Sequence, residues 1–415
     1  MSRSTPDFPR NWLASALISG LVLLAPLPAD PPQCDPGNAG FTLPAGFCAV
    51  LVGDSLGAVR HLVVAPNGDV FAALNSRGGG GILALRDTNR DGRADIRKQF
   101  GPGSGSGIAL GQGYLYFAMN DRIVRYPWAP GQLEPVGEPE TLVQGLPSDG
   151  HGSKGIAVWG DSVLYTSIGS RSNSCQQADR QAHSPGIDPC EELATRGGIW
   201  RFSARRLNQT MADGHRVATG MRNPMAVALQ PGTGVVFAGM NGRDQLSANW
   251  GYSDQDNAEK PAEELLRVEE GADYGWPYCY YDPAAKKRVL APEYGGDGRE
   301  VGRCAGKRDP EVAFPAHWAP LGVRFYDGTM FPASYRGGAF IAFHGSWNRA
   351  PLPQQGYRVV FVPFRNGRAT GGWTDFAVPT SSPTALRPTG LAVGPDGSLY
   401  ISADANGKIW RVVAR

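Results

Sequence analysis

A pattern of two short apolar runs separated by a turn recurs along the chain. The first copy spans residues 62–72 and the last spans residues 391–401; both join their apolar runs by Pro-Asx-Gly and place an aromatic residue at a matching offset. Asn-Gly or Asp-Gly between apolar runs is typical of a β-hairpin, because a type I′ turn needs positive φ at both central residues. Further copies begin at residues 108, 156, 226 and, more loosely, 323. The pattern therefore predicts six hairpins.

Several copies continue into a third strand, at residues 122–126, 198–202 and 408–412. Three or four strands per copy, repeated radially, predict an all-β fold, a six-bladed β-propeller with long inter-strand loops. The strand expected at residues 47–52 has no hairpin partner of its own and is predicted to complete the last blade beside the C-terminal strands. A pair of β-sandwiches is the alternative, although sandwiches show no such fixed repeat.

The copies are unevenly spaced, so the additional residues must form loops. These loops are expected at about residues 172–196, 241–262 and 277–318. Long ordered loops on a rigid scaffold usually carry function. We therefore expect these insertions to build the functional site.

The N-terminal 29 residues have the features of a secretory signal peptide. Arg3 and Arg10 precede an uncharged stretch that ends in Pro-Leu-Pro-Ala before Asp30. An uncleaved anchor is the alternative, but Pro26 and Pro28 argue against a stable membrane span. Residues 1–29 are thus predicted to be a signal peptide and residues 30–415 a single propeller domain, periplasmic or secreted.

Six cysteines agree with export, because oxidising compartments permit disulfides. Fifteen connectivities are possible for six cysteines. Proximity in the sequence favours three local bridges: Cys34 with Cys48, Cys175 with Cys190, and Cys279 with Cys304. The chain has no Cys-x-x-Cys-His, so covalent haem is not expected and any redox chemistry needs a bound cofactor.

The charge balance points to a small-molecule partner. The chain has 40 basic and 38 acidic residues, which gives no reason to expect nucleic acid or an anionic membrane as the main partner. The 56 glycines and 34 prolines are spread along the chain as turns, which agrees with many short strands.

Residues 148–154, Ser-Asp-Gly-His-Gly-Ser-Lys, bring a carboxylate, an imidazole and an ammonium together among glycines. They follow a turn signal and precede an expected strand, so His151 should lie exposed in the loop that enters this strand. The alternative is a turn histidine with no chemical task.

Residues 87–95 offer oxygen ligands at alternating positions. Asp87, Asn89 and Asp91 are followed by Gly92 for the turn and by Asp95, a spacing similar to an EF-hand loop without the glutamate at position twelve. Calcium binding and a plain polar hairpin tip are both open here.

An ordered series of motifs extends these observations. The series consists of His151 with Lys154, residues 220–224 (Gly-Met-Arg-Asn-Pro), 241–244 (Asn-Gly-Arg-Asp), Glu263-Glu264, 273–277 (Asp-Tyr-Gly-Trp-Pro), 317–322, 343–349 (Phe-His-Gly-Ser-Trp-Asn-Arg) and 387–390. In this order, over residues 41–415, the chain resembles the pyrroloquinoline quinone-dependent soluble aldose dehydrogenases, specifically the sorbosone or pyranose dehydrogenase branch.

The resemblance implies a six-bladed propeller that binds the quinone and a calcium ion in a shallow cleft at one mouth. It also implies oxidation of a sugar or sugar aldehyde, with electrons leaving to an external quinone or cytochrome. By position, His151 is the general base, and a neutral imidazole suits the removal of a hydroxyl proton. Arg222 is the second catalytic residue, because a guanidinium can counter charge on the quinone oxygen. In the soluble glucose dehydrogenases an aspartate directly precedes the histidine, whereas here Gly150 separates Asp149 from His151.

The resemblance also implies the ligands of the cofactor and of calcium. An aromatic ring can cover the flat quinone, and guanidinium groups can bind its carboxylates. The cofactor residues are Lys154, Arg222, Asn223, Trp347, Arg349 and Arg387. Backbone carbonyls of Gly242 and Arg243 would hold the ion beside the cofactor, and Glu263, Glu264 and Tyr274 match a second, structural calcium site.

Each of these residues also has an ordinary structural interpretation. Arg222 could close the turn before Pro224, Trp347 could be a core residue, and Lys154 and Arg387 could be solvated charges. Two other functions are also open: a calcium-dependent lactonase that uses His151 and a metal-bound water, and a non-catalytic carbohydrate-binding propeller. Cations around an aromatic side chain favour the quinone enzyme.

Overall fold

The computed structural model describes Met1, residues 32–381 and residues 386–415. Residues 32–415 form one compact unit. Apart from Met1, the predicted signal peptide lies outside the described residues. Within the described part of the chain, no helix is both long and apolar enough to cross a membrane.

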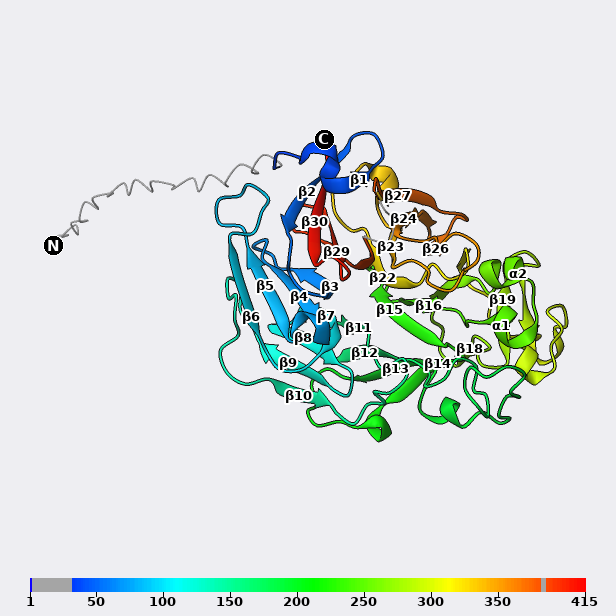
Figure 1. Cartoon of the computed structure of the whole chain (residues 1–415). Helices are drawn as coiled ribbons and strands as arrows, with labels where there is room; N and C mark the ends of the chain where they lie inside the picture. The colour runs from blue at the N-terminus through cyan, green and yellow to red at the C-terminus, as the bar shows by residue number, and fades with distance from the viewer. Residues whose placement is uncertain (2–31, 382–385) are drawn as a thin grey trace. The chain divides into compact units, whose positions relative to one another are not determined.

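Six four-stranded antiparallel sheets are arranged around a common centre, and two of them gain a short fifth strand (Figure 1). The first three blades are β3 (Val59–Val64), β4 (Val70–Leu74), β5 (Ile82–Arg86) and β6 (Ile96–Phe100); β7 (Gly105–Gly111), β8 (Tyr114–Met119), β9 (Ile123–Pro127) and β10 (Glu140–Val143); and β11 (Ile156–Trp159), β12 (Val163–Ile168), β13 (Gly198–Ser203) and β14 (His215–Thr219), extended by β18 (Ala272–Asp273).

The remaining three blades contain the larger insertions and both ends of the described unit. They are β15 (Asn223–Leu229), β16 (Val236–Asn241), β17 (Glu263–Arg267) and β21 (Val312–Phe314); β22 (Pro320–Phe325), β23 (Ala339–Phe343), β24 (Arg358–Val362) and β27 (Thr374–Pro379), extended by β1 (Phe41–Thr42); and β28 (Pro388–Val393), β29 (Leu399–Ala403), β30 (Lys408–Ala414) and β2 (Phe47–Gly53). The predicted six-bladed propeller is confirmed.

The sixth blade closes the ring by pairing the two ends of the unit. β2 runs antiparallel to β30, with Phe47 opposite Ala414 and Leu51 opposite Trp410. The first strands of successive blades are neighbours in the order β3, β7, β11, β15, β22 and β28, and β28 returns to β3. β2 therefore completes the last blade, as its lack of a hairpin partner predicted. It covers the edge of β30, which would otherwise be open.

Apolar side chains fill the spaces between neighbouring blades. Between the fourth and fifth blades, Phe237, Phe325 and Phe343 are buried in one cluster, and Phe237 packs edge-on against Phe325 with ring centroids 5.0 Å apart. Burying a side chain of this size stabilises a fold by roughly 1.5–3 kcal/mol. This packing gives the mouth loops a rigid base.

Two details of the predicted hairpins are wrong. At the first copy only Gly68 has a positive φ, of 93°, and its N–H donates to Ala65 O at 2.9 Å, so the turn is not type I′; Pro66 favours a type I turn at its position. In the fifth blade, β22 is followed by a long loop before β23, and residues 329–331 are not a strand. Tyr326 and Phe331 stack in this loop instead, with centroids 4.6 Å apart.

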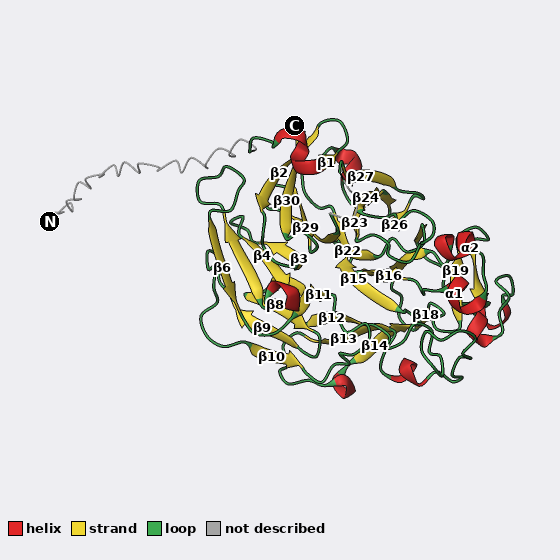
Figure 2. Ribbon diagram, viewed as in Figure 1, coloured by secondary structure: helices red, strands yellow, loops and turns green. Residues whose placement is uncertain are grey.

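The insertions carry most of the irregular structure, and Figure 2 shows that helix is confined to short segments outside the sheets. The fourth-blade insertions contain α1 (Leu246–Trp250), α2 (Asp254–Glu259) and the hairpin β19 (Cys279–Asp282) and β20 (Lys287–Leu290); a smaller hairpin, β25 (Phe364–Arg365) and β26 (Arg368–Ala369), lies in the fifth blade. All three predicted disulfides are present, and two of them lie in insertions.

Candidate functional site

The blade topology brings the chemically active motifs to one mouth of the ring. In an antiparallel blade, the start of the first strand and the end of the second strand lie at the same edge. The residues at this edge include His151 before β11, Arg222 before β15, Asp244 after β16, His344 after β23, Arg387 before β28 and Asp404 after β29.

His151 is held with one defined ring nitrogen facing the protein. Its Nδ1 lies 2.9 Å from Ser170 O and 3.0 Å from Ser170 Oγ. The Ser170 hydroxyl donates its own hydrogen to Ser172 O at 2.6 Å, so both Ser170 oxygens face Nδ1 as acceptors. The neutral imidazole therefore carries its proton on Nδ1 and has its lone pair on Nε2.

Burial, with the positive charge of Arg222 nearby, lowers the pKa of His151 to about 3. The imidazole is therefore neutral at pH 7 and can accept a proton. Asp149 does not hold this ring, because its carboxylate pairs with Arg196. Gly150 separates Asp149 from His151, and the imidazole is held by Ser170 instead of by this aspartate.

Arg222 is buried and bound by three acceptors. Its Nη2 donates to Asp244 Oδ2 at 2.8 Å, its Nη1 to Gly242 O at 2.7 Å and its Nε to Asn173 O at 3.2 Å. A guanidinium has five N–H donors, so two remain for a ligand. The side chain is fixed in place by the protein and still has hydrogen-bonding capacity.

Asp244 links most of the charged groups on this side of the mouth, although no role was predicted for it. Besides Arg222, it accepts hydrogen bonds from Arg180 Nη2 at 3.1 Å and from Asn348 Nδ2 at 2.5 Å. Burial raises the pKa of Asp244, but Arg222, His317 and Arg180 outweigh burial and leave the pKa below its usual value. An acidic residue next to the predicted pair Gly242 and Arg243 was the only sequence signal for it.

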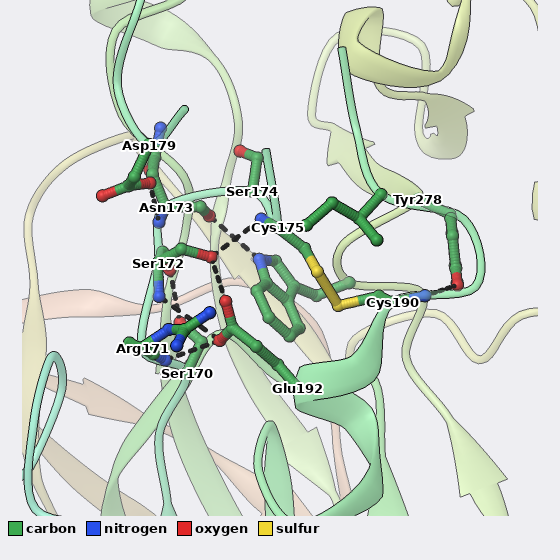
Figure 3. The surroundings of a disulfide bond; sticks show 12 residues. Ser170, Arg171, Ser172, Asn173, Ser174, Cys175, Asp179, Cys190, Glu192 and Tyr278 are labelled. Atoms are coloured by element: carbon green, nitrogen blue, oxygen red, sulfur yellow. Dashed lines mark hydrogen bonds between the residues drawn. A yellow bond between two sulfur atoms is a disulfide. The ribbon is translucent and has the colours of Figure 1, made fainter. Parts of the chain in front are cut away.

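The first insertion, the loop at about residues 172–196, lies beside Arg222. Asn173 O also accepts from Trp276 Nε1 at 2.9 Å, and the Asn173 amide exchanges two hydrogen bonds with the Asp244 backbone, at 3.0 and 2.9 Å. Figure 3 shows the Glu192 carboxylate beside Arg171 and Ser172, with the Cys175–Cys190 disulfide farther along the same loop. Ser170, Asn173 and Glu192 were not predicted, since their contacts arise only in the folded loop.

The loop at residues 343–349 presents an aromatic ring beside buried polar groups. Trp347 is 62% exposed, which excludes the core interpretation. Arg349 is buried, and its Nε donates to Pro353 O at 3.1 Å while its Nη1 donates to Ala258 O. Asn348 Oδ1 is buried with no hydrogen-bond partner among the described residues.

The other predicted cofactor residues differ in their surroundings. Lys154 is fully buried, and its ammonium donates to Pro147 O at 2.7 Å and to Gly152 O; burial lowers its pKa to about 7. It is thus not a solvated charge but holds the loop that carries His151. Arg387 donates to Ser346 O at 3.3 Å, and its Nε has no partner among the described residues.

Asn223 begins β15 close to His151. A Cβ atom on Gly169 would lie 2.6 Å from His151 Cβ and 3.2 Å from Asn223 Oδ1. Glycine at this position therefore allows both side chains to approach the same point. Asn223, Arg222 and His151 form one group at the mouth.

Glu263, Glu264 and Tyr274, which the resemblance implies as calcium ligands, have protein partners here. Glu263 accepts the Gly242 N–H at 3.1 Å, and burial raises its pKa to about 8. Glu264 forms a buried ion pair with Arg288, and the Tyr274 hydroxyl donates to Arg267 O. In the described ranges, no three or more His, Cys, Asp or Glu side chains are grouped as metal ligands.

The loop at residues 87–95 also uses several of its side-chain oxygens internally. Asp87 Oδ2 accepts the Gly92 N–H at 2.8 Å, and Asp95 Oδ2 accepts from Thr88 N and Oγ at 2.9 and 2.7 Å. Asn89 Nδ2 donates to Asp91 at 3.1 Å. Asp87 Oδ1 is buried with no hydrogen-bond partner among the described residues, so calcium binding and a polar hairpin tip both stay predictions for this loop.

The residues at the mouth fit a flat, acidic cofactor. Trp347 offers an open aromatic face, Arg222 and Arg387 have hydrogen-bonding capacity left, and Asn348 Oδ1 lacks a partner among the described residues. A calcium ion there would be held by the carbonyls of Gly242 and Arg243. The Gly242 carbonyl oxygen accepts one hydrogen bond from Arg222 and has a second lone pair.

Fold and site together define a six-bladed propeller with an arginine-lined polar site around a neutral histidine at one mouth. The TrAA12-like family model matches residues 41–415, so the chain belongs to the TrAA12-like family. The family resemblance predicted from the sequence is confirmed.

Three matches illustrate this relationship. The pyrroloquinoline quinone-dependent pyranose dehydrogenase of Coprinopsis cinerea is 33% identical over 123 residues, which cover 24% of this chain and 16% of that protein. The structure of the holo form of the pyranose dehydrogenase PQQ domain from the same organism has a TM-score of 0.74 at 19% identity, over 90% of this chain and 97% of that chain. The calcium structure of a family AA12 carbohydrate-active enzyme from Trichoderma reesei has a TM-score of 0.74 at 19% identity, over 91% and 97%. The chain spans less than half the length of the curated relatives it matches.

Proposed function

We infer that this protein is a pyrroloquinoline quinone-dependent sugar dehydrogenase that oxidises a pyranose or a sugar aldehyde such as sorbosone. The observation that carries the proposal is the His151 imidazole, which is neutral, has its lone pair on Nε2 and lies beside the fixed guanidinium of Arg222. Similarity to dehydrogenases of this cofactor class supports it.

In this proposal His151 takes the proton from the sugar hydroxyl on Nε2. A positioned base of this kind contributes about 10²–10⁴ in rate. Arg222 directs its two remaining N–H donors at developing negative charge, and Asp244 keeps it in place. The quinone, when bound, supplies the hydride acceptor, with calcium as a Lewis acid beside it.

The remaining residues hold the cofactor or the ion. Trp347 covers the ring, Asn223 and Arg387 bind polar groups of the cofactor, and Lys154 and Arg349 hold the loops that form the mouth. Gly242 and Arg243 would bind the calcium ion. The electrons would leave to an external quinone or cytochrome.

A periplasmic or secreted location is part of the proposal. Three disulfides in the described residues support an oxidising compartment. Alkylation of thiols before and after reduction, on protein isolated from its native cell fractions, tests this. Six alkylated cysteines without prior reduction would contradict export.

Reconstitution tests the activity. Purified protein is mixed with pyrroloquinoline quinone, calcium or both, and dye reduction is measured over a panel of aldoses and aldosones. We expect activity only with both additions, because the ion holds and polarises the quinone. Undiminished activity with quinone in chelator-treated protein would exclude the calcium role. Lactone hydrolysis without quinone would replace the proposal by the hydrolase alternative.

A further inference from the structure

The support of His151 extends to a buried carboxylate on a distant part of the first insertion. Glu192 follows Cys190 in a short helical turn at Glu191–Ala194 and is buried. Its Oε2 accepts the N–H groups of Arg171 at 2.6 Å and Ser172 at 3.3 Å, and its Oε1 accepts the Ser172 hydroxyl (Figure 3). The carboxylate thus fixes the backbone directly after Ser170.

The Ser170 turn has two further anchors. The Ser170 N–H donates to Arg222 O at 2.7 Å, and the Cys175 N–H donates to Ser172 Oγ at 2.9 Å. Ser170 O also accepts the backbone N–H of His151 at 2.9 Å. Both oxygens that face the imidazole are therefore carried by a turn that is bonded on each side.

We propose that Glu192 and Ser170 are positioning residues that place the His151 proton on Nδ1 and present the Nε2 lone pair at the mouth. Glu192 acts through the Arg171–Ser172 backbone, and Ser170 acts directly on the ring. This role rests on the proposed function, in which His151 Nε2 accepts the hydroxyl proton. A neutral support replaces the carboxylate that could otherwise hold such a ring, since Asp149 pairs with Arg196.

The tautomer can be read directly in cofactor-free protein. Isotope-labelled histidine and nitrogen–proton correlation spectra distinguish Nδ1–H from Nε2–H, and His151→Gln assigns the signals. We expect wild-type His151 as the Nδ1–H form, and an added Nε2–H population in Glu192→Gln and in Ser170→Ala. Glu191→Gln is the matched control, because this neighbouring glutamate is exposed.

Kinetics of the reconstituted enzyme give the second readout. Misplacing the base by a fraction of an ångström to an ångström should lower kcat by about tenfold in both variants. KM should stay within about twofold, because the residues that bind the cofactor are untouched. A general loss of folding would instead lower the active fraction and leave the tautomer of the folded fraction unchanged.

Two results would overturn the proposal: an unchanged Nδ1–H tautomer in the folded variants, or a changed tautomer with an unchanged kcat. If Glu192→Gln does not fold, Ser170→Ala decides. A different pattern identifies failure of the proposed function alone. In that case the tautomer shifts in the variants as expected, while wild-type protein with quinone and calcium oxidises no sugar in the panel.

Discussion

Two histidines at the mouth have opposite kinds of support. His151, beside the insertion-rich third and fourth blades, is held by the neutral oxygens of Ser170. His344, at the end of β23, donates from Nε2 to the buried carboxylate of Asp404 at 2.8 Å. Asp404 also binds Arg60 Nη1 at 2.8 Å. A carboxylate partner makes an imidazole a stronger base, so charge alone would favour His344.

Proton placement favours His151 instead. His344 uses Nε2, the ring atom farthest from its backbone, to reach Asp404, and this leaves only Nδ1 as an acceptor. His151 uses Nδ1 internally and leaves Nε2 for a ligand. Burial lowers the pKa of His344 despite Asp404, so neither ring is charged at neutral pH. The position of the free ring lone pair, rather than basicity, therefore favours His151 over His344 as the base.

The largest expected effect is on catalysis. His151→Ala should lower the rate of sugar-driven quinone reduction by about 10²–10⁴, because it removes the base. Quinone binding should be nearly unchanged, since Arg222 and Trp347 remain. Stopped-flow absorbance of the quinone measures both quantities.

His344→Gln is the paired variant in that experiment and should lower the rate by less than about tenfold. A larger loss for His344→Gln than for His151→Ala would assign the base to the Asp404 side.

The second effect is on stability. Asp404 is 1% exposed, and Asp404→Asn leaves the Arg60 guanidinium, whose side chain is 11% exposed, without its counter-charge. Breaking such a pair costs about 3 kcal/mol. Asp149→Asn, at an ion pair whose carboxylate is 61% exposed, should cost less than about 1 kcal/mol. Urea unfolding of both variants checks the contrast, and equal losses would contradict it.

The fold was more predictable from the sequence than the site. Each predicted hairpin is local in the sequence, so the six blades were predictable from apolar runs and turn residues such as Asn67 and Gly68. The loop after β22 could not, because Tyr326 and Phe331 stack where the repeat predicted a second strand. Local spacing does not encode that contact.

At the site, His151 and Arg222 were predictable because they lie directly before strands. Asp244, Ser170 and Glu192 were not, since they act through contacts with residues about 20 positions away in the sequence. The pKa of His151 could not be predicted from the sequence either. An isolated imidazole titrates near pH 6.5, whereas burial beside Arg222 lowers the pKa of His151 to about 3.

The third prediction compares two disulfides that close loops of similar length. Cys34–Cys48 and Cys175–Cys190 have sequence separations of 14 and 15 residues. Removing either pair, as the double alanine variant, should cost about 3 kcal/mol by loop entropy. Only the second pair lies beside the Ser170 turn, so only Cys175→Ala/Cys190→Ala should also lower kcat, by about tenfold.

Thermal unfolding and kinetics well below the melting temperature separate these two effects. A fall in kcat in the Cys34→Ala/Cys48→Ala variant as well would show that the loss is general and not tied to His151.

The smallest effect is on the pH dependence of the rate. The groups that set the charge around His151 are Arg222 and Arg180, which oppose its protonation, and Asp244, which favours it. With a pKa of about 3 the imidazole is already neutral at about pH 5, so the rate of quinone reduction should change by less than about twofold between about pH 5 and pH 8.

The free energy of unfolding, in contrast to the rate, should depend on pH in this range. In the unfolded chain His151 binds a proton near pH 6.5, whereas the folded ring does not. The group therefore stabilises the fold above that pH, and its contribution is lost as the pH falls toward 3. Rates in wild type and in His344→Gln, and the unfolding free energy of wild type against His151→Gln, measure the two sides. A rate limb near pH 6.5 that disappears in His151→Gln would show that the ring is more exposed than its contacts with Ser170 indicate.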